Sequence, residues 1–167
     1  MKRKNQNRVR FVTLSATFAA LYVVMTLVSA IFGLSSGAIQ IRISEALCAL
    51  CYFTPAAIPG LTVGCLVSNL VTGANFLDVI FGTLATFIGA MGGWLLRKQR
   101  FSWLVTVPTV LANTIIIPFV IVYGFGVTDI ALPLLSLSIF VGEFVSATVL
   151  GTGLIAILKK YSFRFYR

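Results

Sequence analysis

The sequence predicts an all-α integral membrane protein that crosses the membrane six times, with both termini on the cytoplasmic side. Of its 167 residues, 59% are hydrophobic and 10% are charged, and the mean hydropathy is +1.02. An ordinary soluble domain is about 45–50% apolar and roughly 25% charged. The chain has too few polar side chains to cover a globule in water, and its length suits one domain, residues 1–167, in lipid.

Charge clustering is the second observation behind this fold class. Twelve of the thirteen basic residues fall into three groups beside long apolar runs: Lys2, Arg3, Lys4, Arg8 and Arg10; Arg97, Lys98 and Arg100; and Lys159, Lys160, Arg164 and Arg167. Basic residues collect on the cytoplasmic flanks of membrane spans. The net charge of +9 is thus explained by membrane topology, and no basic stripe with interleaved aromatic residues indicates nucleic-acid binding.

Four apolar runs are long enough to cross a hydrocarbon core as helices. The first, 11–33, follows the basic cytoplasmic segment 1–10 and is 23 residues long, which exceeds the roughly 7–15 residues of a signal-peptide core. The others are 77–96, 101–123 and 133–158, each close to the ~20 residues that a spanning helix needs.

The region 43–74 is expected to form two short helices, 43–55 and 58–74, hinged at the sequence TPAAIPG. If this region crossed only once, the cluster at 97–100 would lie outside the cell. If it crosses out and back, all three basic clusters lie inside, together with the tail 159–167. The two helices are shorter than the usual ~17–25 residues, so they would have to thin the bilayer or bury their ends against neighbours.

The four acidic residues are all predicted to lie away from the cytoplasmic side. Glu45, Asp78 and Asp129 are at outward loops or helix starts, where they could serve as a partner for Arg42, a helix cap and a turn residue. Glu143 is inside the last helix. A charge in the middle of a span costs roughly 2.5–3.5 kcal/mol and usually marks a binding site or a transport pathway.

Polar residues at helical spacing accompany these charges on three predicted helices. They are Asn69, Thr72 and Asn75; Ser102, Thr106, Thr109 and Asn113, extended by Tyr123; and Ser136, Glu143 and Ser146. Such residues can simply hold helices together in lipid. Their convergence on the outer half of the bundle, near Glu143, favours an outward-facing polar pocket.

Small residues four apart form a separate pattern. They are Ala16 and Ala20, Gly60 and Gly64, and Ala85, Gly89 and Gly93. Small side chains let helix backbones approach closely, either within the bundle or against a partner protein.

No motif for chemistry of its own is present in the sequence. The chain contains no histidine, so the pair Cys48 and Cys51 does not suit a zinc site. It also lacks a phosphate-binding loop for nucleotide hydrolysis and a nucleophile elbow. We expect a binding protein that is not an enzyme and needs no cofactor or metal.

Three linked segments resemble a known family. IQIRISEAL, AAIPGLTVGCLVSNL and LDVIFGTLATFIGAMGGWLLRK, within residues 39–98, are similar to the QueT family of queuosine-precursor transporters, which are substrate-binding S components of energy-coupling factor (ECF) importers. The resemblance extends over 11–158. It implies a six-helix protein of the bacterial plasma membrane that binds a vitamin-like molecule from outside, with a membrane-embedded coupling protein and two ATPase subunits as partners. Ala16 and Ala20 match the family's docking motif.

The family implies a deazaguanine base or nucleoside as ligand. Its guanine-like edge offers adjacent N–H donors, which suit a carboxylate such as Glu143 or Glu45. The predicted binding residues are Arg42, Glu45, Asn69, Asn75, Asp78, Asn113 and Glu143. Three alternatives stay open: an S component for another vitamin such as cobalamin, a stand-alone secondary transporter that uses Glu143, and a membrane scaffold.

Overall fold

The computed structural model describes residues 2–33, 42–126 and 130–161. The predicted turn residue Asp129 and tail residues 162–167 lie outside these ranges. Every secondary-structure element within the described ranges is a helix, which confirms the all-α class. In order they are α1 (Lys2–Ile31), the 3₁₀-helix η1 (Ile43–Tyr52), α2 (Ala57–Val71), α3 (Phe76–Leu96), the 3₁₀-helix η2 (Ser102–Val105), α4 (Val107–Phe125), α5 (Leu132–Glu143), the π-helix η3 (Phe144–Leu150) and α6 (Gly151–Lys160).

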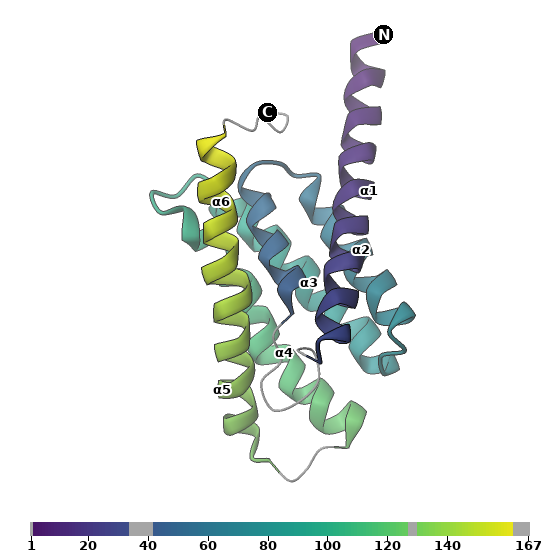
Figure 1. The fold of residues 1–167 in the computed structure, drawn as a ribbon, viewed down its shortest axis with the longest axis vertical. Coiled ribbons are helices and arrows are strands. Elements are labelled where there is room, and N and C mark those ends of the chain that lie inside the picture. Colours follow the sequence, from purple (N-terminus) through teal and green to yellow (C-terminus); the bar gives the residue numbers. More distant parts are fainter. Residues whose placement is uncertain (1, 34–41, 127–129, 162–167) are drawn as a thin grey trace.

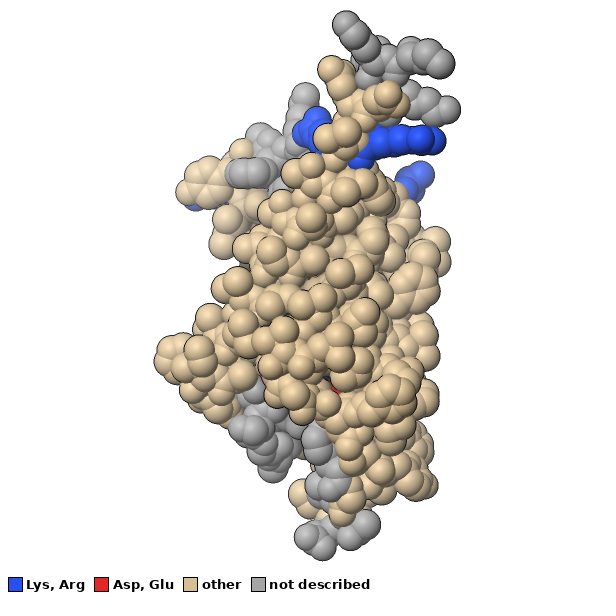
Figure 2. Space-filling view, turned by 90° about the vertical axis from the view of Figure 1, so that its right-hand side faces the viewer, with Lys and Arg blue, Asp and Glu red and all other residues tan. Residues whose placement is uncertain are grey.

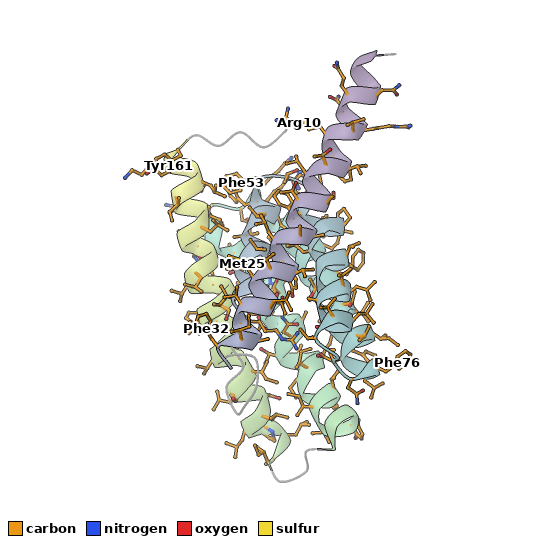
Figure 3. All side chains as sticks on the ribbon, turned by 45° about the vertical axis from the view of Figure 1, so that its right-hand side comes forward. Arg10, Met25, Phe32, Phe53, Phe76 and Tyr161 are labelled. Carbon is orange, nitrogen blue, oxygen red and sulfur yellow. The ribbon has the colours of Figure 1, made fainter. Side chains whose placement is uncertain are left out.

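The helices form one bundle with two distinct ends, and successive passes along the chain alternate in direction (Figure 1). Figure 3 places Arg10, Phe53 and Tyr161 toward one end and Phe32 and Phe76 toward the opposite end, beyond which α4 and α5 extend. The Lys and Arg side chains visible in Figure 2 gather at the first of these, here called the basic end. The surface between the ends is almost entirely uncharged on that face.

Four helical stretches are long and apolar enough to cross a membrane: Asn5–Ile31, Phe76–Leu96, Ser102–Gly124 and Leu132–Lys160. Large apolar side chains such as Val24, Leu84 and Ile115 are exposed on the outside of the bundle, where lipid would cover them. The chain is thus a multi-pass membrane protein. The count of six crossings and the cytoplasmic position of the termini stay predictions.

The first helix is longer than the expected range 11–33. It begins at Lys2, so most of the basic segment 1–10 is helical and projects beyond the bundle at the basic end (Figure 1). At ~1.5 Å per residue, the nine residues from Lys2 to Arg10 extend the helix by roughly 13 Å.

The segment η1 is the buried centre of the bundle. It packs against α1, α3, η3 and α6, and its residues Ser44–Cys51 are all buried. Burial on every side explains why this helix has no polar stripe. A 3₁₀-helix rises ~2.0 Å per residue, so ten residues reach about 20 Å, compared with about 15 Å for an α-helix. The 3₁₀ geometry therefore offsets much of the shortness noted from the sequence.

Glycines bring neighbouring helices into close contact. A Cβ atom at Gly64 of α2 would lie 2.7 Å from the Cβ atom of Tyr22 on α1, and one at Gly89 of α3 would lie 2.7 Å from the Cα atom of Thr109 on α4. Two of the small-residue patterns therefore act inside the bundle. Ala16 and Ala20 differ, because both are exposed on the outer face of α1.

The predicted last helix is one continuous helical stretch with an irregular centre. Its α5 part ends at Glu143, seven residues of π-helix follow, and α6 completes it. π-Helical turns are rare and occur often at functional sites. Here the π-helical η3 packs against the 3₁₀-helical η1.

Candidate functional site

An ion pair joins the start of η1 to the start of α3. A guanidinium N–H of Arg42 donates to a carboxylate oxygen of Asp78 at 3.1 Å, and the Asn69 side chain donates to the Asp78 backbone carbonyl at 3.2 Å. The alternative in which Arg42 and Glu45 form a surface ion pair is wrong, because Arg42 pairs with Asp78. The helix cap is also reassigned, because Asn75, and not Asp78, accepts the backbone N–H of Leu77 at the start of α3.

A second polar cluster ties η1 to α1. The Tyr22 hydroxyl donates to the Glu45 carboxylate, which is only 2% exposed. Next to it, the Thr26 hydroxyl donates to the Ser44 hydroxyl at 2.9 Å. The sequence analysis did not single out the α1 residues. Their spacing was the available signal, because Tyr22, Thr26 and Ser29 follow each other at four and three residues, on one helix face.

The Ser29 hydroxyl completes this connection. It accepts the backbone N–H of Ile43 at 3.1 Å, and so satisfies a donor at the first turn of η1 that has no partner within the helix. Together with the bonds of Tyr22 and Thr26, it fixes η1 along α1 and sets the direction of the Glu45 side chain.

A third cluster lies between α4 and the last helix. Glu143 is buried, and its carboxylate interacts with the Asn113 side chain. Its second oxygen, Oε2, has no hydrogen-bond partner within the described residues, and neither does the hydroxyl of Ser146, one turn further on. Buried polar atoms almost always have a partner, so these atoms suit the groups of a bound ligand.

The three clusters are close enough to interact. Glu143 interacts electrostatically with both Glu45 and Arg42. Six of the seven predicted binding residues are therefore brought into one site: Arg42, Glu45, Asn69, Asp78, Asn113 and Glu143. Asn75 has another structural role, because it caps α3 and its amide donates to the Gly124 carbonyl at the end of α4.

The polar stripe of α4 is only partly as expected. Thr106, Thr109 and Asn113 are buried, and Thr106 donates to the Thr148 hydroxyl of η3 at 3.1 Å. This hydrogen bond connects Thr106 to η3. Thr106 therefore has the helix-joining role that the sequence analysis gave as the alternative to ligand binding. The predicted extension to Tyr123 is wrong, because its side chain is 76% exposed.

The site lies toward the end of the bundle opposite to the basic end. Asp78 is in the first turn of α3, and Phe76 at the start of that helix lies on the side of the bundle away from the basic end (Figure 3). The acidic groups are enclosed, and on the face seen in Figure 2 only a speck of acidic surface is visible. The arrangement gathers three buried carboxyl groups, two amide side chains and one arginine.

Comparisons with known proteins agree with a transport role. The family model described as QueT transporter matches residues 12–160. The queuosine precursor transporter QueT of Lactococcus lactis subsp. cremoris (strain MG1363) is 36% identical over 91 residues, which are 53% of this chain and 53% of that protein. The match thus spans about half the length of this curated relative. No solved structure matches the chain.

The family model covers the bundle from residue 12 in α1 to Lys160, the last residue of α6. The resemblance stated for residues 39–98 and over 11–158 is thereby confirmed. The chain belongs to the QueT transporter family.

Proposed function

We propose that the chain is the substrate-binding S component of an ECF importer for a queuosine precursor. It binds a deazaguanine base or nucleoside at the site around Glu45 and Glu143 and delivers it together with a coupling membrane protein and two ATPase subunits. The chain itself binds the ligand and does not hydrolyse nucleotide. The observation that carries this proposal is the buried Oε2 atom of Glu143, which has no hydrogen-bond partner within the described residues.

The geometry of the site supports a ligand with hydrogen-bond donors. Carboxylates accept hydrogen bonds and cannot donate them when ionised. Asn113 can donate or accept, so it can read a second edge of a heterocycle.

The outer face of α1 supports docking on a partner. Its exposed residues include Thr13, Ala16, Thr17 and Ala20, all small. The Thr13 and Thr17 hydroxyls donate to carbonyls one turn earlier in the same helix, so they do not need other partners. A flat face of small residues allows close contact with another membrane helix.

The topology of this proposal has six crossings, with the basic end in the cytoplasm of a bacterial cell. The alternating direction of the helices and the gathering of Lys and Arg at one end support it (Figures 1 and 2). The short helices η1 and α2 then cross beside the four longer stretches, and the site opens away from the cytoplasm.

Two measurements test the proposal. Calorimetry on the purified chain in nanodiscs should detect binding of a 7-deazaguanine base. Vesicles that hold the chain alone should not accumulate the base, whereas vesicles that also contain the coupling protein and both ATPases should accumulate it when ATP is supplied. Absence of binding would contradict the proposal that a 7-deazaguanine base is the substrate.

A secondary transporter is the second candidate, because Glu143 is a buried acid in a membrane-crossing helix. It predicts the opposite result in the vesicle assay. The chain alone would then accumulate the base when a proton gradient is imposed, with no ATP and no partner subunit.

A further inference from the structure

Three cations at the basic end are held against aromatic rings. The Arg97 Cζ atom lies 3.3 Å from the centre of the Trp94 ring. The Lys159 Nζ atom lies 4.2 Å from the centre of the Tyr52 ring, and the Arg100 Cζ atom lies 5.5 Å from the ring of the residue that follows it. All three distances are within the ~6 Å range of a cation–π contact. Such a contact fixes the position of a cation and leaves its net charge in place.

The short helix η2 brings these cations together. It packs against α3, η1 and α6. Two groups of basic residues therefore lie around it, one in the segment between α3 and η2 and the other in the last turn of α6. Phe53 and Tyr161, which follow η1 and α6, both lie toward the basic end (Figure 3). The η2 cluster is defined here as Arg97, Lys98, Arg100, Lys159 and Lys160.

No acid among the described residues forms an ion pair with the η2 cluster. Those acids are Glu45, Asp78 and Glu143, which are all buried in the candidate site, and the ion pair found there joins Asp78 to Arg42. Like charges that are gathered in one place repel one another. An anion from outside the chain would therefore stabilise the η2 cluster.

Apolar side chains are exposed beside the same cations. Leu95, Phe101 and Trp103 are all exposed. Tryptophan at the end of a membrane-crossing stretch is typical of the boundary between hydrocarbon and headgroups. A molecule that covers both the cations and the apolar side chains needs an anionic head and an apolar body. Anionic phospholipids have this chemistry, and lipid surrounds a multi-pass membrane protein.

We propose that the η2 cluster binds the headgroup of an anionic phospholipid such as phosphatidylglycerol. The phosphate oxygens accept charge-assisted hydrogen bonds from the guanidinium groups of Arg97 and Arg100 and from the ammonium group of Lys159. The acyl chains cover the exposed apolar side chains next to them. Basic pockets between membrane helices bind lipid headgroups in this way. The inference goes beyond the proposed function and does not depend on the substrate.

A diffuse attraction is the competing explanation. Any cation near a membrane surface attracts anionic lipids, and segment 2–10 of α1 carries five basic residues of its own. In that case, cations removed from α1 would weaken lipid binding as much as cations removed from the η2 cluster. The two explanations therefore differ in where a loss of charge matters.

The two tryptophans of the sequence, Trp94 and Trp103, report on this place, because one lies against Arg97 and the other is part of η2. The chain is reconstituted in vesicles of phosphatidylglycerol and phosphatidylcholine, with bromine on the acyl chains of one lipid at a time. Brominated chains quench tryptophan fluorescence on contact. At equal mole fractions, brominated phosphatidylglycerol should quench as if it were enriched about fivefold or more beside the tryptophans. Equal quenching by the two lipids would overturn the inference.

Matched variants locate the binding. Arg100→Gln combined with Lys159→Gln removes two charges of the η2 cluster and leaves the cation beside Trp94 in place. The preference for phosphatidylglycerol should then fall toward one. Arg3→Gln combined with Arg8→Gln is the control, because it removes the same charge from α1, and it should keep the preference. A preference that both double variants lose equally, or that neither loses, would contradict a site at η2.

Inorganic phosphate distinguishes a lipid site from a site for a free anion. Excess phosphate should not relieve the quenching by brominated phosphatidylglycerol more than chloride does at the same ionic strength. Relief by phosphate alone would show a free-anion site and would overturn the lipid inference. None of these measurements uses a base, so a failure of the proposed substrate would leave their outcome unaffected.

Discussion

Arg42 and Asp78 lie 36 residues apart in the chain and form an ion pair at 3.1 Å that joins η1 to α3. Asp78 is 6% exposed and Arg42 is 18% exposed at their side chains. In Arg42→Gln or Asp78→Asn, the remaining charge loses its partner in a largely buried place. We expect each single variant to have a lower free energy of unfolding. The double variant should lose less stability than the sum of the two single losses, with a coupling energy of about 1–3 kcal/mol. Denaturation in mixed micelles measures this, and additive losses would show that the pair does not stabilise the fold.

Close packing between α1 and α2 gives a second prediction. In Gly64→Ala the new methyl group would lie 2.7 Å from the Tyr22 Cβ atom and 3.0 Å from the Ala19 carbonyl oxygen, so one helix must shift. We expect a loss of about 1–3 kcal/mol of stability, as for other overpacked interiors. Gly153→Ala in α6 is the control, because a Cβ atom there has no neighbour within 4 Å. Its stability should stay the same or rise by up to about 1 kcal/mol. Melting temperatures of the two variants that fall equally would contradict this packing argument.

The outer face of α1 gives a third prediction. Ala16→Leu combined with Ala20→Leu adds bulk to a face that the bundle leaves exposed. We expect uptake by the full ECF complex to be abolished while binding of the base by the isolated chain stays unchanged. Ala156→Leu, at an exposed alanine of α6, should leave both properties intact. Normal uptake by the double variant would remove the docking role of this face.

Membrane topology gives a fourth prediction, which can be tested by cysteine labelling. The three native cysteines are buried, so they should react little with a polar maleimide. Introduced cysteines at positions 53 and 98 should react from the cytoplasm, and one at position 72 should react from outside. Position 53 decides the number of crossings, because it is cytoplasmic only if η1 crosses inward and α2 crosses back outward. Labelling of position 53 from outside would contradict six crossings and would favour four.

The sequence predicted the helices well because the physical signal is strong. Long apolar runs must form helices in lipid, since their backbone groups have no other partners there. Charges are rare in such runs, so Arg42, Glu45, Asp78 and Glu143 were recognisable as candidates for a site, and their role in binding stays a prediction. Their pairing was not predictable, because Arg42 reaches Asp78 across 36 residues of sequence, while its neighbour Glu45 bonds to Tyr22.

Other features escaped prediction for specific reasons. Tyr22 lies in an apolar run, where an aromatic residue is typical of the lipid face or the core. Asn75 was assigned to the ligand, although an asparagine directly before a helix is also a good N-cap. Hydropathy does not distinguish a 3₁₀- or π-helix from an α-helix when nearly every residue is apolar, so η1 and η3 were visible only in the structure.

The geometry of η1 also accounts for the cysteine pair. With three residues per turn, side chains three apart stand directly above one another. Glu45, Cys48 and Cys51 therefore form a single row, while Ala46 and Ala49 form another that fits against Gly151 of α6. The spacing that looks like a metal-binding motif is the repeat of a stretched helix. Relatives that keep this geometry should repeat their small and polar residues every third position in this segment.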